Sequence, residues 1–306
     1  MSNRRKKGRE VNGWLAIDKA VGRTSTEIVA SVKRLFGAQK VGHAGPLDPL
    51  ASGILPIALG EATKTVPFVQ DSRKVYRFTV EWGVETDTDD AEGKPVATAD
   101  IRPSREAILA ALPAFTGEIM QRPPAYSAVK IGGERAYDLA REGETVEIAE
   151  RPVTVHRLDL ADMPDAGHAV FEAECGKGTY VRAIARDLGR ALGCLGHVVA
   201  LRRVSVGPFV EEGAIDLETL IAAREDGGAD TLDRFLLPID TALGELPEIA
   251  FHQGDAARIG RGQAVILRGR DAPAFAGTLR ATFAGRTIAI GEIDKGAFHP
   301  KRVFTG

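Results

Sequence analysis

The sequence predicts an α+β protein in which one large domain precedes a small β-rich domain. The 306 residues exceed the length of a typical single domain, and the composition, 44% hydrophobic and 27% charged, is ordinary for a globular protein. Residues 24–37 have the capping and spacing of an amphipathic helix, residues 74–82 alternate as a strand, and residues 264–293 form short alternating runs punctuated by glycines. Helices and strands therefore mix in the large domain, whereas strands dominate the C-terminal part.

The N-terminal part predicts a strand, a helix and a second strand. Residues 12–19 alternate loosely, as in a strand. Thr24, with Glu27 three residues later, forms a capping box at the start of a helix, and Gly37 is a residue type that ends one. Residues 54–59 form a short apolar run that predicts a buried strand. The apolar stripe of the helix consists of Ile28, Val29, Val32, Leu35 and Phe36, and Lys33, Arg34 and Lys40 are left to solvent.

The next part of the chain predicts two helices, a strand and an acidic loop. Residues 63–69 predict a short helix that ends near Pro67, and residues 104–115 predict a capped one. Residues 74–82 form the clearest strand of the sequence. Residues 85–92 are acidic and rich in turn formers, and we expect a solvated loop, because nothing in the pattern fixes their carboxylates around a metal ion.

Residues 121–150 predict an insertion into the large domain. Arginines and lysines accompany the glycine pair Gly132 and Gly133, and a helix is expected at about residues 135–141. Exposed cations and glycine joints suit a mobile clamp on an RNA backbone, although an ordinary surface hairpin has a similar composition.

The rest of the large domain predicts strands that alternate with helices. The expected strands are residues 153–160, 169–175 and 197–209, and the expected helices are residues 179–192 and 216–224. Arginines recur every four residues at Arg182, Arg186 and Arg190, a stripe that is usually a solvated helix face. Lys177 and its flanking glycines lack the spacing of a phosphate loop, which argues against binding of a nucleoside triphosphate.

The charge of the chain is unevenly distributed. The net charge is −2, yet residues 1–43 carry ten positive and three negative side chains, and residues 258–302 carry nine and three. Between them, residues 211–255 carry twelve acidic side chains against two arginines. This pattern indicates a protein that binds a polyanion at defined places. Residues 1–10 are expected to form a basic flexible tail.

The composition also bears on location and cofactors. No run approaches the roughly 18 apolar residues of a membrane span, and the N-terminus lacks the apolar core of a signal peptide, so we expect a cytoplasmic protein. Cys175 and Cys194 follow no metal-ligand spacing and lie in apolar stretches, so we expect reduced, unreactive thiols and no bound metal. No apolar stripe is left over, so we expect a monomer without a protein or membrane partner.

The stretch from residue 42 to residue 56 predicts a shaped loop around one carboxylate. Its three glycines free the backbone and its three prolines fix it, and Asp48 lies between Leu47 and Pro49. Burial among apolar side chains would neutralise a lone carboxyl, whereas a nearby cation would keep it ionised and usable as a nucleophile or base. The alternative is an ordinary loop aspartate in an Asx-turn.

Residues 42–53, GHAGPLDPLASG, resemble the signature G-H-x-G-x-L-D-P-x-A-x-G of the bacterial tRNA pseudouridine-55 synthases, the TruB family. The resemblance is close from residue 11 to about residue 210 and looser beyond. Ala44 stands where many members have threonine, and Ala20 where many have proline, and neither change touches the carboxylate. Further matching segments are residues 15–19, 60–64, 74–77, 83–90, 123–130, 177–182 and 201–203.

The resemblance implies a pseudouridine synthase fold of the α+β class, with a central mixed, mostly antiparallel sheet flanked by helices. It implies a catalytic domain at residues 11–245 that contains the RNA-clamping insertion at about residues 121–150. Residues 246–306 resemble, more weakly, a small PUA-like RNA-binding domain.

The resemblance also implies the site residues. Asp48 matches the nucleophile, Tyr76 the aromatic residue that stacks on the target base and is implicated in proton removal, and Arg182 the cation that pairs with the aspartate. From the pattern alone, Tyr76 would be a tyrosine at the edge of the core. His43 matches a side chain that enters the space left by the flipped base, with simple loop packing as the alternative, and Leu201 matches a wall of the pocket. The substrate-binding residues implied are His43, Lys19, Lys64, Lys130, Tyr180, Leu201 and Arg202.

The implied activity is that of an isomerase. The resemblance implies that the uridine at position 55, in the T-arm stem-loop of tRNA, is flipped out and converted to pseudouridine, a reaction that needs no cofactor because it has no net redox change. One alternative is a non-catalytic RNA-binding or tRNA-folding protein. Another is a hydrolase that uses His43 and Asp48 as an acid–base pair, which the lack of a third orienting residue and of a second carboxylate disfavours.

Overall fold

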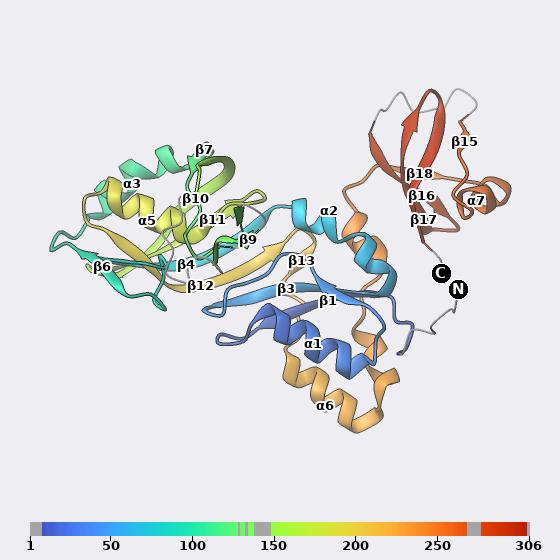
Figure 1. Cartoon of the computed structure of the whole chain (residues 1–306), viewed down its shortest axis with the longest axis horizontal. Helices are drawn as coiled ribbons and strands as arrows, with labels where there is room; N and C mark the ends of the chain where they lie inside the picture. Colours follow the sequence, from blue (N-terminus) through green and yellow to red (C-terminus); the bar gives the residue numbers. More distant parts are fainter. Residues whose placement is uncertain (1–7, 128, 132–133, 138–147, 268–276, 305–306) are drawn as a thin grey trace.

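The computed structural model describes residues 8–127, 129–131, 134–137, 148–267 and 277–304, and a nine-stranded sheet forms its centre (Figure 1). The strands of this sheet are β1 (Gly13–Lys19), β2 (Val41–His43), β3 (Ala51–Leu59), β4 (Lys74–Trp82), β7 (Gly117–Gln121), β10 (Arg151–Asp165), β11 (His168–Cys175), β12 (Gly196–Val206) and β13 (Phe209–Val210).

The order of the strands brings distant parts of the chain together. The path runs β1-β3-β12-β4-β11-β10-β7, with β2 beside β3 and β13 beside β12. Strands β3 and β12 are parallel, and the other neighbours are antiparallel. The predicted mixed, mostly antiparallel sheet is therefore confirmed. The placement of β12 between β3 and β4 sets residues near 201 beside both the Asp48 loop and Tyr76.

Helices cover the sheet in two groups (Figure 1): α1 and α6 lie near β1 and β3, and α3 and α5 near the other end of the sheet. The α-helices of the large domain are α1 (Ser25–Phe36), α2 (Val66–Asp71), α3 (Arg105–Ala111), α5 (Val181–Ala191) and α6 (Leu217–Gly227), and its 3₁₀ helices are η1 (Gly60–Lys64), η2 (Leu112–Phe115), η3 (Ala229–Phe235) and η4 (Ile239–Leu243). Two small hairpins pair β5 (Val84–Thr86) with β6 (Pro95–Thr98) and β8 (Lys130–Ile131) with β9 (Glu134–Arg135).

Helix α1 shows how local sequence determines an element. The hydroxyl of Thr24 accepts from the Glu27 backbone N–H at 3.2 Å, and the Glu27 carboxylate accepts from the Thr24 N–H at 2.7 Å. Gly37 ends the helix with φ of 58°, a left-handed conformation that glycine adopts without a steric penalty. The predicted capping box and helix end are therefore confirmed.

Two local predictions are wrong, and a third concerns residues that are largely not described. Pro67 lies in the first turn of α2, where its missing N–H costs nothing, and the helix continues to Asp71. Residues 85–92 are not a solvated loop, since Glu85, Asp89 and Asp90 are buried. The helix expected at residues 135–141 falls mostly outside the described residues.

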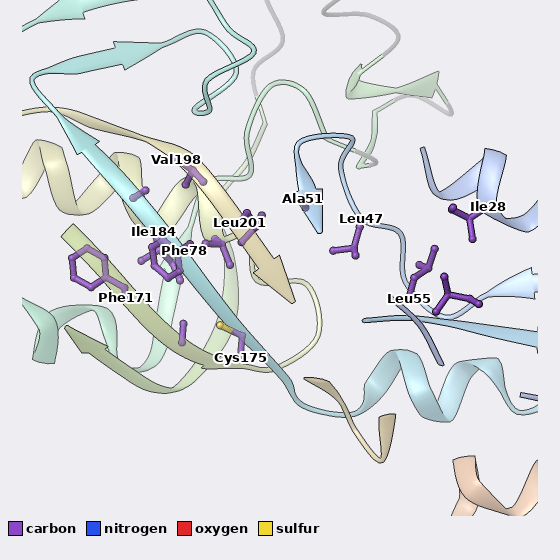
Figure 2. Close-up of a cluster of buried hydrophobic side chains, with 14 of the residues drawn as sticks. Ile28, Leu47, Ala51, Leu55, Phe78, Phe171, Cys175, Ile184, Val198 and Leu201 are labelled. Carbon is purple, nitrogen blue, oxygen red and sulfur yellow. The ribbon is translucent and has the colours of Figure 1, made fainter. Parts of the chain in front are cut away.

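The hydrophobic core extends from the sheet to the loop that carries Asp48 (Figure 2). Phe78 of β4 stacks on Phe171 of β11 with ring centroids 5.4 Å apart. Leu47, the residue before Asp48, belongs to the same cluster and is 7% exposed, so the core anchors the loop. Cys175 also lies in this core, where burial raises the pKa of its thiol to about 12, so the thiol is protonated and unreactive at neutral pH.

A second sheet forms a C-terminal module with its own core, built around Ile259, Leu279 and Phe298. Its strand order is β14-β16-β17-β18-β15. The strands expected at residues 264–293 are confirmed, whereas β14, β18 and the helix α7 were not predicted. The elements are β14 (Glu248–Ala250), α7 (Gln253–Ile259), β15 (Val265–Ile266), β16 (Thr278–Phe283), β17 (Arg286–Asp294) and β18 (Ala297–Val303).

Polar contacts join this module to the large domain. Lys64 of η1 donates to the backbone oxygen of Val303 at 2.7 Å, and Arg280 of β16 lies 3.3 Å from Asp240 of η4. Among the helices that the structure describes, none is long and apolar enough to cross a membrane.

Candidate active site

The loop between β2 and β3 carries Asp48 and is fixed at both ends. Ser25, the first residue of α1, accepts from the Leu47 N–H at 2.8 Å and donates to the Leu47 carbonyl at 3.0 Å. The Asp48 carbonyl accepts from the Ala51 N–H at 3.0 Å, which starts β3. The Asp48 carboxylate is therefore held at the end of a rigid strand, with its side chain 44% exposed.

Arg203 of β12 shapes the same loop from the other side. Its guanidinium donates to the carbonyls of Gly45, Pro46 and Ile54 at 3.0, 3.3 and 2.8 Å, and Arg203 is only 2% exposed. Arg203 belongs to a matching segment of the sequence but was not predicted as a site residue. The available signal was strand alternation, which places it on the same face as Leu201.

Tyr76 lies directly across from Arg203 in the pairing of β4 and β12. Burial raises the pKa of the Tyr76 hydroxyl, and the Arg203 charge partly opposes this. The charge of Asp48 also raises the pKa of Tyr76 and of Arg203, so the three groups lie close enough to interact. The tyrosine is therefore neutral at physiological pH.

Arg182 of α5 pairs with Asp48, as expected, with Nη2 2.9 Å from Oδ2. The Arg182 side chain is 6% exposed and the Asp48 side chain 44% exposed, so the arginine is the buried member of the pair. From the sequence, the aspartate was expected to be the buried one. Since a guanidinium cannot be deprotonated at neutral pH, it needs further acceptors when buried.

Those acceptors come from two other segments. Arg182 Nη1 lies 3.3 Å from Asp90 and donates to the Thr88 carbonyl at 2.8 Å, and Nη2 donates to the Tyr126 carbonyl at 3.0 Å. The acidic stretch that was expected to be solvated thus supplies a buried counter-ion, because long-range pairing with α5 takes it out of water. One guanidinium bridges Asp48, Asp90 and the first part of the insertion.

His43, Leu201 and Tyr180 are near this cluster. Burial lowers the pKa of the His43 imidazole, and the Arg203 charge lowers it further, so the ring is neutral at pH 7. Its Nδ1 is buried without a hydrogen-bond partner among the residues described. Leu201 is 8% exposed and pairs with Phe78 and Ala51. Tyr180 precedes α5, and the Arg151 guanidinium lies 5.4 Å from its ring centre.

The predicted basic binding residues have other partners in the structure. Lys19 is fully buried and donates to the carbonyls of Arg23 and Pro49 at 2.8 and 3.4 Å, so it braces the Asp48 loop. Arg202 makes a bidentate ion pair with Asp18 at 3.0 and 2.8 Å and also pairs with Glu211. Lys64 contacts Glu61 and the C-terminal module. Lys130 lies in the β8 strand of the insertion.

Gly53 is a position where this loop tolerates no side chain. Its φ is +98°, and an added Cβ would lie 2.2 Å from the Arg203 carbonyl oxygen. We expect Gly53→Ala to lower the free energy of unfolding by more than about 2 kcal/mol, as measured by urea denaturation. Gly42→Ala, where a Cβ has open space, is the matched control and should cost less than about 1 kcal/mol. Equal stabilities would show that the loop can move away from Arg203.

The arrangement brings a carboxylate, a fixed cation and a neutral tyrosine together in the middle of the central sheet, where β3, β12 and β4 are neighbours. A half-exposed carboxylate beside a buried guanidinium can attack an electrophilic carbon, and a nearby tyrosine can stack on a planar ring or exchange a proton. The Asp48 side chain pairs with Arg182, and the turn hydrogen bond from the Ala51 N–H goes to the main-chain carbonyl of Asp48. In a simple Asx-turn the side chain would accept such a bond, so the loop differs from that alternative.

Known proteins resemble this chain in both sequence and fold. Residues 33–181 match the model of the TruB family pseudouridylate synthase N-terminal domain, and residues 182–244 match the tRNA pseudouridylate synthase B C-terminal domain. A chain in the crystal structure of a Cbf5-Nop10-Gar1 complex superposes with a TM-score of 0.73 at 26% identity, covering 96% of this chain and 85% of that one. The fold and the family models therefore define a pseudouridine synthase, an isomerase.

Relatives define the family more narrowly. The tRNA pseudouridine synthase B of Nitrobacter winogradskyi is 63% identical over 302 residues, covering 98% of this chain and 84% of the relative. The protein of the same name from Agrobacterium fabrum is 56% identical over 306 residues, covering 99% and 97%. The chain belongs to the TruB family of pseudouridine synthases, which confirms the predicted resemblance.

Proposed function

We propose that this protein converts the uridine at position 55 in the T-loop of tRNA to pseudouridine, with Asp48 as the nucleophile. The observation that carries the proposal is the pair of Asp48 and Arg182, 2.9 Å apart, on a loop whose shape Arg203 fixes. The curated relatives that carry the name tRNA pseudouridine synthase B support the choice of tRNA.

In the proposed reaction, the Asp48 carboxylate bonds to C1′ of the ribose as the N-glycosidic bond breaks, and the uracil then turns. C5 bonds to C1′ as the bond to Asp48 breaks, and the C5 proton then leaves while N1 gains one. Atoms and electrons balance within the nucleotide, so neither an oxidant nor a metal is required. Arg182 holds the Asp48 carboxylate in position for attack through their ion pair. Tyr76 stacks on the uracil, and the C5 proton goes either to a water molecule or to the Tyr76 oxygen once the hydroxyl has passed its own proton to water.

The uridine must leave the stacked T-loop before it can reach Asp48. Flipping a base costs a few kcal/mol, and stacking on Tyr76 with entry of His43 into the vacated space can offset this cost. A neutral His43 suits this role, since it enters a base stack without bringing a charge. Leu201 would form an apolar wall beside the flipped base.

The remaining parts of the chain have supporting roles in this proposal. Residues 11–245 act as the catalytic domain, residues 121–150 clamp the RNA backbone, and residues 246–306 act as a PUA-like RNA-binding domain. Lys64 and Arg202 contribute to RNA binding, and each also pairs with a carboxylate of the protein, Lys64 with Glu61 and Arg202 with Asp18. The protein acts as a monomer in the cytoplasm.

The test is release of a hydrogen label from C5 of uridine in an unmodified tRNA transcript. We expect label release from the parent transcript and none when cytidine replaces the T-loop uridine at position 55. Release of label from both transcripts would contradict the choice of site. Binding of the transcript without any release would instead support a non-catalytic RNA-binding protein.

A further inference from the structure

Three arginines of α5 face three carboxylates in β5 and the turn that follows it. Arg182 pairs with Asp90 at 3.3 Å, Arg186 with Asp89 at 2.9 Å, and Arg190 with Glu85 at 2.6 Å. The exposed fractions of the arginine side chains are 6%, 7% and 52% along the helix. The first pair belongs to the site already described, and in the third pair the arginine is half-exposed, whereas both members of the second pair are buried and have no role in the proposed reaction.

The buried pair of Asp89 and Arg186 is held at a position that the backbone adopts only under constraint. Asp89 has φ of +61°, an uncommon conformation for a residue with a side chain, and its carbonyl accepts from the Val198 N–H at 3.1 Å. Arg186 is also fixed on its own helix, because its Nε donates to Asp187 at 2.8 Å. The ion pair thus joins two rigid elements, β12 through Asp89 and α5 through Arg186.

Both buried arginines also hold the first residues of the insertion. Arg186 Nη2 donates to the Arg122 carbonyl at 2.8 Å, and Arg182 Nη2 donates to the Tyr126 carbonyl at 3.0 Å. The same Nη2 atom of Arg182 lies 2.9 Å from Asp48. Movement of residues 122–126 would therefore displace the guanidinium that orients the nucleophile.

We propose that Asp89 and Arg186 are a positioning pair that fixes the start of the insertion and, through it, the orientation of Arg182 at Asp48. Neither residue touches the reacting atoms. The pair couples the segment that contacts the RNA backbone to the ion pair at the reaction centre, so RNA held by the insertion meets an aligned Asp48. This inference rests on the proposed function for its catalytic consequence, but the structural coupling is independent of it.

The charges around Asp89 predict a specific dependence of the reaction rate on pH. The groups facing it are Arg182, Arg186 and Arg190 of α5 and Glu85 of β5, and Asp187 shares Arg186. Burial raises the pKa of Asp89 to about 6, although the two nearer arginines oppose the shift. As the pH falls through 6, Asp89 gains a proton and its ion pair with Arg186 is lost. A folded pKa above the ordinary value means that this protonation favours the folded state, so loss of activity by this route does not require unfolding.

The experiment compares Asp89→Asn with Glu85→Gln, the same change in the outer pair. With saturating tRNA transcript, we expect Asp89→Asn to lower the single-turnover rate roughly ten- to a hundredfold at pH 7.5 without changing transcript affinity, because sub-ångström misplacement has effects of this order. The parent rate should fall below pH 6, and the Asp89→Asn rate should lack this acidic limb. Glu85→Gln should keep the parent rate at pH 7.5, and its acidic limb should remain but lie at a lower pH, because removing the Glu85 charge lowers the pKa of Asp89.

A second measurement does not depend on activity. Amide hydrogen exchange of residues 121–127 should be faster in Asp89→Asn than in the parent, and unchanged in Glu85→Gln. Arg186→Lys keeps the positive charge, but a lysine cannot donate to Asp89, Asp187 and the Arg122 carbonyl at the same time. This variant should therefore also speed amide exchange of residues 121–127. Parent-like rate, pH profile and exchange in Asp89→Asn would overturn the proposal. An inactive parent would reject the proposed function, while exchange would still decide whether the pair positions the insertion.

Discussion

Replacing Asp48 by asparagine is expected to stop pseudouridine formation while leaving the fold and the affinity for tRNA in place. The amide is similar in shape but is a poor nucleophile, so the rate of label release from C5 should fall more than about 1,000-fold. The Asp48 side chain is 44% exposed, and Arg182 keeps Asp90 as a counter-ion, so the free energy of unfolding should change by less than about 1 kcal/mol. Single-turnover label release, transcript binding and urea denaturation measure the three quantities.

The matched control for this change is Asp18→Asn. Asp18, near the end of β1, is another aspartate that pairs with an arginine, Arg202, and we do not expect it to contact the uridine. Its substitution should leave label release within about tenfold of the parent, since an exposed ion pair contributes little. If Asp48→Asn retains parent-like release while Asp18→Asn loses it, the nucleophile has been assigned to the wrong loop.

Elements whose causes are local could be predicted from the sequence. The capping box at Thr24 and the left-handed Gly37 depend on neighbours within a turn, and the alternation of residues 74–82 depends only on one strand. Pro67 shows the limit of local reasoning, because a proline can begin a helix as well as end one. Whether a proline begins or ends a helix depends on the conformation of the residues that precede the proline.

Burial of charge could not be predicted in the same way. The acidic turn and the arginine stripe of α5 each resemble a solvated surface when considered alone. Arg182, Arg186 and the carboxylates that pair with them are buried because the two segments face one another across about 100 residues of sequence, with Arg186 and Asp89 2.9 Å apart. Only the sheet order, which places β12 beside β4, brings these segments together.

Site residues were predictable where chemistry singles them out and harder to predict where their role is support. Asp48 stands alone in an apolar loop, so its need for a cation could be inferred, although Arg182 was identified through family resemblance. Arg203 carries no such signal, because its hydrogen bonds go to main-chain carbonyls that any loop possesses. Lys19 was expected from the family resemblance to bind substrate, yet the residue is fully buried and its ammonium group donates to main-chain carbonyls.

Replacing Arg182 by methionine should remove both activity and stability. Asp90, whose side chain is 4% exposed, would be left buried without its cation, and the free energy of unfolding should fall by about 3–5 kcal/mol. Asp48 would lose the guanidinium that aligns it, so label release should fall by at least about 100-fold at a temperature where the variant is folded. Urea denaturation and single-turnover label release test the two effects.

The double variant Arg182→Met with Asp90→Asn separates these two roles of the arginine. Removing the buried carboxylate charge should restore more than half of the lost stability, because the uncompensated charge causes most of the loss. It should not restore label release, since Asp48 still lacks its cation. A double variant that recovers both stability and activity would mean that Arg182 acts only as the counter-ion of Asp90, and the alignment of Asp48 would then have to come from Arg203 and the loop itself.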